Sequence, residues 1–103
     1  MSKENNTGLN TAEKIADKLK EPEDYHVILL NDDFTSMDFV VEILMDVFHK
    51  SMEDAANIML HVHKQGKGIA GMYPWDIAIT KVDQVHNIAR MNEFPLKCII
   101  EKA

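Results

Sequence analysis

The segment Leu30–Val40, LNDDFTSMDFV, constrains the fold of this chain more than any other. It begins where the short apolar run Tyr25–Leu30 ends, and the composition of that run suits a half-buried strand. Asn31, Asp32 and Asp33 then place three short polar side chains in a row, which favours a turn or a helix start. Ser36 is a suitable N-cap, because apolar residues recur after it at helical spacing: Phe39, Val40, Ile43, Leu44 and Val47. The segment predicts a strand, a polar elbow (residues 31–36) and a helix.

The rest of the pattern predicts two further strands and two further helices. The first helix should run from Met37 to about Phe48, and a second, capped by Ser51, should run to about Lys64 and stop at Gly66. The other expected elements are a strand over Lys67–Tyr73, a helix with Pro74 in its first position that ends near Asn92, and a strand over Lys97–Glu101. The order βααβαβ predicts an α+β fold, with a three-stranded antiparallel sheet packed against three helices.

Apolar residues at helical spacing predict which faces are buried. In the third helix these are Trp75, Ile77, Ala78, Val82, Val85, Ile88 and Ala89. The seven methionines, among them Met45, Met52 and Met72, are mostly interpreted as core residues, with Met37 and Met59 as adaptable walls of a pocket.

Length and composition limit the domain organisation. The 103 residues allow one small domain, expected over 24–103. Residues 1–23 are polar and charged, and we expect a flexible extension there. Leu9, Ile15 and Leu19 are too few apolar residues for firm docking, and a helix over Ala12–Leu19 would be marginal alone.

Charge and cysteine content exclude several classes of function. The net charge of −6 argues against a nucleic-acid-binding protein and suits attraction of cationic groups. The single cysteine, Cys98, allows no internal disulfide, which favours a reducing compartment. The sequence has no membrane-length apolar run and no secretory core, so we expect a cytoplasmic protein without a membrane partner.

The residues that could carry chemistry leave two interpretations open. His63 shares a helical stripe with Met59 and Val62, and could be a ligand-binding group or a satisfied boundary residue. A metal-binding or hydrolytic domain that uses Asp32, Asp33 and His63 is one alternative. A zinc pair of His61 and His63 is disfavoured, because residues two apart on a helix point about 200° apart.

Calcium binding and nucleophilic catalysis also find little support. A calcium loop starting at Asn31 would have Ser36 where glycine is required. A triad of Cys98, His63 and Asp32 would need an activated thiol, but Cys98 is predicted to lie inside a short strand. Our leading expectation is a non-enzymatic protein without a metal site or cofactor, and the metal-binding or hydrolytic domain remains the alternative.

Three segments resemble the ClpS family, the bacterial adaptors that hand N-degron substrates to the Clp unfoldase and protease. They are Val27–Phe39 (VILLNDDFTSMDF), Met59–Lys67 (MLHVHKQGK) and Pro95–Ala103 (PLKCIIEKA), and the resemblance covers about residues 24–103 in order. It implies a small α+β domain similar to the C-terminal domain of the ribosomal stalk protein, which agrees with the βααβαβ pattern.

The resemblance also implies a site for the substrate's first residue. Its free α-amino group would be held by Asn31, Asp32 and His63. Its side chain, Leu, Phe, Tyr or Trp, would occupy a pocket lined or bordered by Asp33, Thr35, Met37, Val40, Met59, Val62 and Leu96. Asp32 would supply the countercharge to an ammonium that offers three donors. A module of the same fold without a substrate pocket is a third hypothesis.

The resemblance further implies a contact with the N-terminal domain of a Clp AAA+ unfoldase, ClpA or a ClpC-like relative. The matching positions on the third helix are Asp76, where the family more often has glutamate, and Lys81. Ser36 and Phe34 stand where the family commonly has proline and tyrosine, and His61 replaces a usual small residue. In the family, the unfoldase engages the N-terminal extension, which is needed for substrate hand-off.

Overall fold

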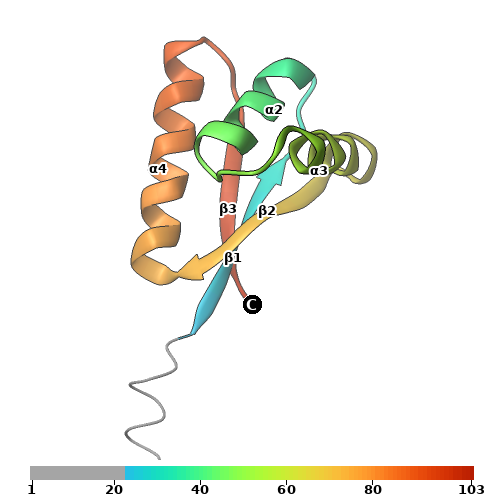
Figure 1. Cartoon of the computed structure of the whole chain (residues 1–103). Coiled ribbons are helices and arrows are strands. Elements are labelled where there is room, and N and C mark those ends of the chain that lie inside the picture. Colours follow the sequence, from blue (N-terminus) through green and yellow to red (C-terminus); the bar gives the residue numbers. More distant parts are fainter. Residues whose placement is uncertain (1–22) are drawn as a thin grey trace, which may run out of the picture.

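Three strands and three helices make up the fold in a computed structural model that describes residues 23–103 (Figure 1). The expected extension, residues 1–23, lies outside the described part except for Glu23. The elements are β1 Asp24–Leu30, α2 Met37–Asp46, α3 Met52–Gln65, β2 Lys67–Pro74, α4 Trp75–Met91 and β3 Lys97–Lys102. The predicted βααβαβ order and α+β class are confirmed.

The sheet is antiparallel, with β1 in the centre and the order β2-β1-β3. Ile28 pairs with Ile69 on one side and with Ile99 on the other. A bulge interrupts the β1–β2 register: Val27 pairs with Gly71, but the next residue, Ile28, pairs with Ile69, so Ala70 has no partner of its own. At the start of β1, Glu23 and Lys102 form an exposed ion pair of 3.0 Å.

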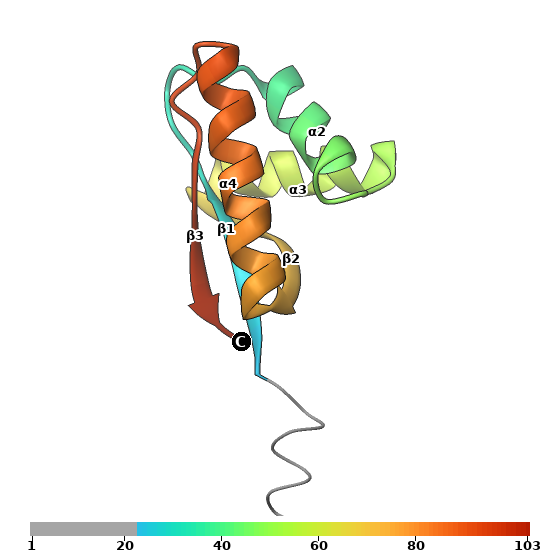
Figure 2. The ribbon, with the colours of Figure 1, turned by 90° about the vertical axis from the view of Figure 1, so that its left-hand side faces the viewer.

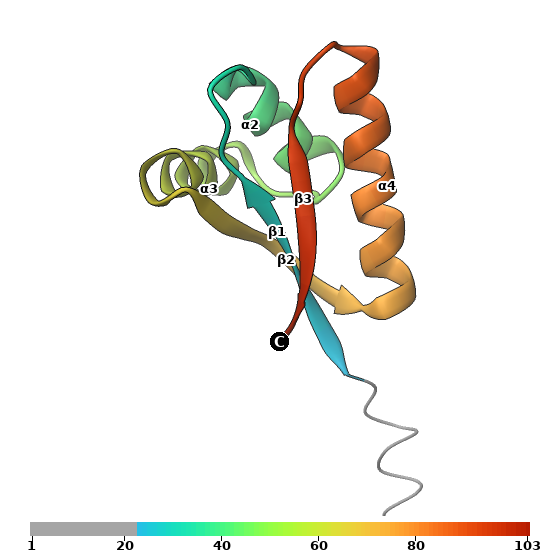
Figure 3. The same ribbon diagram turned by 180° about the vertical axis from the view of Figure 1, so that it is seen from behind.

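The helices cover the sheet unequally. In the side view, α4 and α2 lie on the same side of the strands (Figure 2). Val27 and Leu29 are fully buried and join the core with residues of α2 and α4 that include Ile43, Leu44 and Val85. From behind, β1 and β3 face the viewer with no described helix in front of them, and α3 lies beside the sheet next to β2 (Figure 3). The described elements therefore leave one face of the sheet open along these strands.

The helix boundaries follow the predicted capping residues. Ser36 is extended and its hydroxyl accepts a hydrogen bond from the Phe39 amide (3.1 Å), while Ser51 caps α3 through the Asp54 amide (3.1 Å). Gly66 ends α3 with φ +91°, a left-handed conformation that favours glycine. All three of these predictions are confirmed.

The end of β2 and the start of α4 differ from the prediction. Pro74 is the N-cap of α4 and the last residue of β2, so it is not the first helical residue. Trp75 and Ile77 are 51% and 44% exposed, so their assignment to the buried face of α4 is wrong. A helix that begins at the margin of the sheet has its first turn only partly covered. Trp75 instead packs edge-on against Tyr25, with ring centroids 5.2 Å apart.

The interpretation of the methionines as mostly core residues is also wrong in part. Met45 and Met59 pack against the core, but Met52 and Met72 are 68% and 55% exposed. Met52 is the first residue of α3 and Met72 lies near the end of β2, where no described element covers it fully.

Candidate functional site

A cavity of about 370 Å³ opens where β1 ends, α2 begins and α3 finishes. We call it the elbow cavity, because residues 31–36 form one side of it. It brings together every residue predicted for the site except Leu96. The lining residues are Asn31, Asp32, Asp33, Phe34, Thr35, Ser36, Met37, Val40, Met59, Val62 and His63.

The turn at Gly66 brings the two halves of the cavity together. The chain turns after α3 because the backbone of Gly66 is in the left-handed conformation. The Gly66 carbonyl accepts a hydrogen bond from the Asn31 amide at 2.9 Å. This bond fixes the start of the elbow beside the last turn of α3, which carries His63. The sequence-distant Asn31 and His63 thereby line the same cavity.

Glycine at position 68 allows α3 to lie directly against β2. A Cβ atom there would stand 2.8 Å from Val62 Cγ2 and 3.1 Å from His61 Cδ2, closer than side chains tolerate. Val62 lines the elbow cavity, whereas His61 lies on the other side of α3. Helix α3 thus separates the elbow cavity from a second hollow, and its residues line both.

The Asp32 carboxylate is held in place by the elbow itself. Its Oδ1 accepts hydrogen bonds from the amides of Phe34 (2.8 Å) and Thr35 (2.7 Å), and its Oδ2 accepts one from the Thr35 hydroxyl (2.7 Å). A carboxylate has about four acceptor positions. About one is therefore left for a ligand, and the carboxylate cannot rotate freely to find it.

The same hydrogen bonds determine the charge of Asp32. Partial burial raises the pKa of this carboxyl group, but the three hydrogen bonds from Thr35 and Phe34 outweigh it. The net result is a pKa below the ordinary value of 3.8, so Asp32 carries a negative charge at neutral pH. The cavity therefore contains a fixed anionic group beside polar neighbours.

Apolar groups form the other wall of the cavity. Val40 and Val62 are buried, at 8% and 3% exposure, and Met59 packs against the core. Met37, the first residue of α2, is 45% exposed and lines the cavity. One end of the cavity thus suits a cation and the other an apolar group.

Three of the predicted functional residues lie outside the cavity. Leu96 is 3% exposed, belongs to the core and borders a separate hollow beside Phe94. Asp76 is exposed in the first turn of α4. Lys81 is half-buried: its Nζ donates to the Val47 carbonyl at 2.6 Å and lies 5.6 Å from the centre of the Tyr73 ring.

Sequence reasoning missed two lining residues, Phe34 and Ser36. Both lie within the predicted elbow, so their position between Asp33 and Met37 was an available signal. Phe34 is 78% exposed and lines the cavity. Ser36 contributes while it caps α2.

The described residues also bear on the metal and nucleophile alternatives. Within residues 23–103, no three His, Cys, Asp or Glu side chains are grouped so that they could hold a metal ion. Cys98 is buried beside His86, not beside His63 or Asp32; its amide donates to His86 Nε2 at 3.1 Å. Burial raises the pKa of the thiol to about 12, so it is a poor nucleophile.

Membrane insertion of the described helices can be judged from their length and composition. None of the helices within residues 23–103 has the length and apolar character of a membrane span.

The family model and the relatives that match this chain carry the same description. A family model described as "ATP-dependent Clp protease adaptor protein ClpS" matches residues 20–99. This chain is 55% identical to a protein from Syntrophus aciditrophicus and 52% identical to one from Maricaulis maris, both named ATP-dependent Clp protease adapter protein ClpS. The first alignment covers 84% of this chain and 80% of the relative, and the second 96% and 89%.

A solved structure has the same architecture. It is that of Agrobacterium tumefaciens ClpS2 bound to L-phenylalaninamide, which aligns with a TM-score of 0.77 and 33% sequence identity. The alignment covers 80% of this chain and 99% of that one.

Proposed function

The chain belongs to the ClpS family of Clp protease adaptors, and from this premise we propose that its elbow cavity binds the first residue of N-degron peptides and proteins. The observation that carries the proposal is the fixed Asp32 carboxylate at one end of a cavity whose other wall is apolar. The adaptor would bind and deliver a substrate without catalysing a reaction.

The ligand of the related structure supports this chemistry. L-phenylalaninamide, bound by the Agrobacterium ClpS2, carries a free α-amino group and a benzyl side chain. In this chain, the ammonium group would take the free acceptor position of Asp32, with the side-chain oxygen of Asn31 and a neutral ring nitrogen of His63 as further acceptors.

The apolar wall would then receive the side chain of the bound residue. Val40, Met59 and Val62 are its most apolar lining residues, and Thr35, Met37 and Asp33 also line the cavity. Full burial of a Leu or Phe side chain is worth about 1.5–3 kcal/mol. We propose Leu, Phe, Tyr and Trp as the preferred first residues.

Peptide binding tests this function directly. Fluorescent peptides that differ only at residue one should bind tightly when that residue is Leu, Phe, Tyr or Trp, and weakly when it is Asp or Gly. N-acetylation should abolish binding, because it removes the ammonium charge and two of its donors. Equal binding of the acetylated peptide would exclude amine recognition. Binding that depends on added metal, or turnover of the peptide, would favour the metal-binding or hydrolytic alternative.

Delivery to a Clp AAA+ unfoldase, ClpA or ClpC-like, is the second part of the proposal. Asp76 and Lys81 on α4 are the proposed contact residues, and the site would operate in the cytoplasm. Lys81 also donates to the carbonyl of Val47, the C-cap of α2, so its ammonium group is held against the end of that helix. A partner carboxylate would approach the ammonium group in this fixed position.

A further inference from the structure

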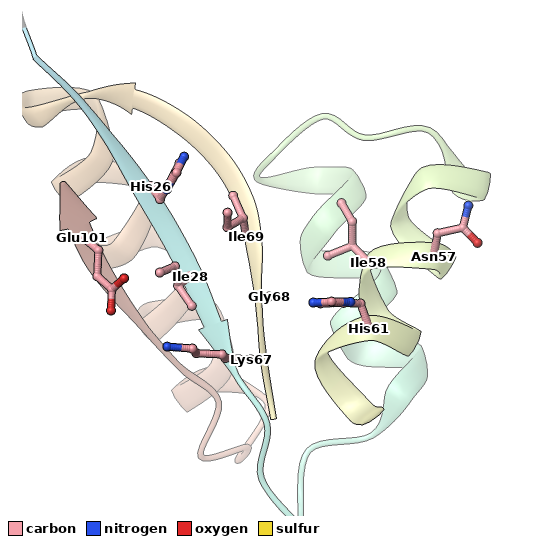
Figure 4. Close-up of a pocket in the computed structure, with 9 residues that line it drawn as sticks. All are labelled: His26, Ile28, Asn57, Ile58, His61, Lys67, Gly68, Ile69 and Glu101. Carbon is pink, nitrogen blue, oxygen red and sulfur yellow. The ribbon is translucent and has the colours of Figure 1, made fainter. Parts of the chain in front are cut away.

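A second hollow on the described part of the molecule is larger than the elbow cavity. A groove of about 540 Å³ lies between the open face of the sheet and α3 (Figure 4). Ile28 and Ile69 form its floor on β1 and β2, and Ile58 and His61 point toward them from α3. We call this hollow the sheet groove.

The floor of the sheet groove continues into an apolar row across the sheet. Ile28 pairs with Ile69 and Ile99; Ile28 itself is 5% exposed, and the two outer isoleucines are 49% and 39% exposed. Single exposed apolar residues are ordinary, but two exposed isoleucines that flank a buried one beside a groove are typical of a surface that binds a partner.

We propose that the sheet groove binds residues 12–19 of the chain itself, as a short amphipathic helix. Those residues are AEKIADKL, and they place apolar side chains on one helical stripe: Ala12, Ile15, Ala16 and Leu19. The charged residues Glu13, Lys14, Asp17 and Lys18 would face away from the sheet. The stripe is narrow, which suits a groove that has three isoleucines as its apolar contacts.

The point where the described chain begins makes this docking geometrically simple. Residue 19 is connected to Asp24, the first residue of β1, by five residue steps, which reach about 17 Å when extended. Ile28 lies four residues along β1, about 13 Å from Asp24. Residues 20–23, which include Pro22, would therefore form the reversal, and Leu19 would reach Ile28 without strain.

The linkage also explains why few apolar anchors suffice. Ile15 and Leu19 would bind a separate protein weakly, and a helix of this length is marginal alone. Because the segment is joined to β1, its effective concentration at the groove is high, and weak contacts produce partial, reversible docking. A partner that binds residues 1–22 would have to compete with the groove, so docking would limit how readily the segment is captured.

Paramagnetic relaxation in the full-length protein tests the proposal. A nitroxide is attached through Asp17→Cys, on the side of the expected helix opposite Ile15 and Leu19. Cys98 is buried and its thiol pKa is raised to about 12, so it escapes labelling. We expect loss of the amide signals of His61 and Ile69, with the signals of Ile77 on α4 retained.

Matched variants separate docking in the groove from unspecific contact. Ile69→Glu in the groove and, independently, Leu19→Glu in the segment should each restore the lost signals. Ile77→Glu changes a residue of similar exposure (44%, against 49% for Ile69) outside the groove, and it should leave the signal loss unchanged. Restoration by Leu19→Glu does not depend on the stability of the groove variant.

Three results would overturn the proposal. The first is retention of the groove signals in the labelled protein, and the second is uniform loss over the whole domain. The third is loss of groove signals only when labelled and isotope-enriched molecules are mixed, which would assign the groove to a second copy. Peptide binding at the elbow cavity enters none of these readouts, so the test is independent of the proposed function.

Discussion

The elbow cavity and the sheet groove lie on opposite sides of α3, and they differ in what their walls are made of. The groove is larger, about 540 Å³ against 370 Å³, and its floor is a row of isoleucines. The elbow cavity is smaller but contains a carboxylate fixed by three hydrogen bonds. Judged by volume alone, the sheet groove would be the better candidate for a ligand site. The fixed charge beside an apolar wall makes the elbow cavity the better candidate for a ligand that carries a cationic group next to an apolar one.

Removal of the Asp32 charge should have the largest effect on the elbow cavity. Asp32→Asn keeps an oxygen that can accept from the amides of Phe34 and Thr35 but removes the countercharge. We expect a loss of about 2–5 kcal/mol in affinity for a Leu-first peptide. Fluorescence anisotropy measures the affinity, and circular dichroism verifies the fold.

The choice of asparagine follows from the hydrogen bonds. Asp32→Ala would also remove the acceptor of two backbone amides and could disorder the elbow, so a loss of affinity would be ambiguous. Asp38→Asn, in the exposed first turn of α2 and outside the cavity, is the charge-matched control. If Asp32→Asn binds as tightly as the parent, the assignment of Asp32 to the ammonium group is wrong.

His63 should contribute the next largest part of the affinity. A ring nitrogen of His63 would accept a hydrogen bond from the ammonium group, and alanine offers no acceptor in its place. We therefore expect His63→Ala to weaken binding of a Leu-first peptide by about 1.5–3 kcal/mol. Fluorescence anisotropy measures the affinity.

The control is the His63→Gln variant, whose side-chain oxygen can also accept a hydrogen bond, so it should lose less affinity than His63→Ala. A His63→Ala protein that binds as tightly as the parent would make His63 a bystander of the site.

Acidification should lower the folding stability through His86, which lines neither the elbow cavity nor the sheet groove. Burial, together with the charges of Lys97 and Arg90, lowers the pKa of His86 below 6.5, so the folded state favours its neutral form. The acceptor for the Cys98 amide is then present above about pH 6.5 and is lost as the pH falls through the lowered pKa. Denaturant unfolding should show stability decreasing on acidification.

His86→Ala should remove most of this dependence and cost about 1 kcal/mol of stability at pH 8. Peptide affinity of the folded variant at pH 8 should equal that of the parent. A His86→Ala protein whose stability decreases with acid as steeply as the parent would exclude this hydrogen bond as the cause.

The two regions were not equally predictable from the sequence. The residue types of Ser36, Gly66 and the Asn31–Asp33 run predict the caps and the turn around the elbow cavity. The same pattern left His63 open as a ligand-binding group or a boundary residue, and its assignment to the site came from the family resemblance. The third-helix contact and the substrate chemistry came from family resemblance and not from spacing.

The sheet groove could not be predicted in the same way. It depends on Gly68 bringing α3 against β2, on the bulge opposite Val27 and on the absence of a helix over β1 and β3 in the described chain. Ile69 and Ile99 alternate with more buried neighbours, and Ile28 lies within the buried run Val27–Leu29, a pattern that is equally typical of a covered strand face. The placement of Leu96 could not be predicted for a similar reason. An apolar residue before a strand can face a cavity or the core, and Leu96 faces the core.

Specificity within the elbow cavity should depend on Met37. Its side chain is half-exposed at the cavity and can narrow the space beside the backbone of the bound residue. An Ile or Val substrate residue is wide next to its backbone and stiff at χ1. Met37→Ala should therefore improve binding of Ile-first peptide relative to Leu-first peptide by about 1 kcal/mol. An unchanged preference would reject this role, and Met52→Ala, at an exposed residue outside the cavity, is the matched control.

Deletion of residues 1–20 should affect the elbow cavity least of all. None of the described residues that line the cavity is removed, and a change away from a site alters affinity by about 0.5 kcal/mol or less. Degradation of an N-degron reporter by the reconstituted unfoldase and protease should nevertheless fall sharply, because a segment joined to the bound adaptor is what the unfoldase would grasp. The two assays use the same preparation.

The deletion also distinguishes the two regions in one protein. If residues 12–19 occupy the sheet groove, their removal exposes Ile69 and leaves Asp32 and its hydrogen bonds untouched. The groove amides should then shift in the NMR spectrum while the amides of Phe34 and Thr35 stay in place. Weakened peptide binding would make the segment part of the elbow site. Undiminished degradation would mean that residues 21–103 suffice for hand-off. Docking of residues 12–19 in the sheet groove would then have no consequence for delivery.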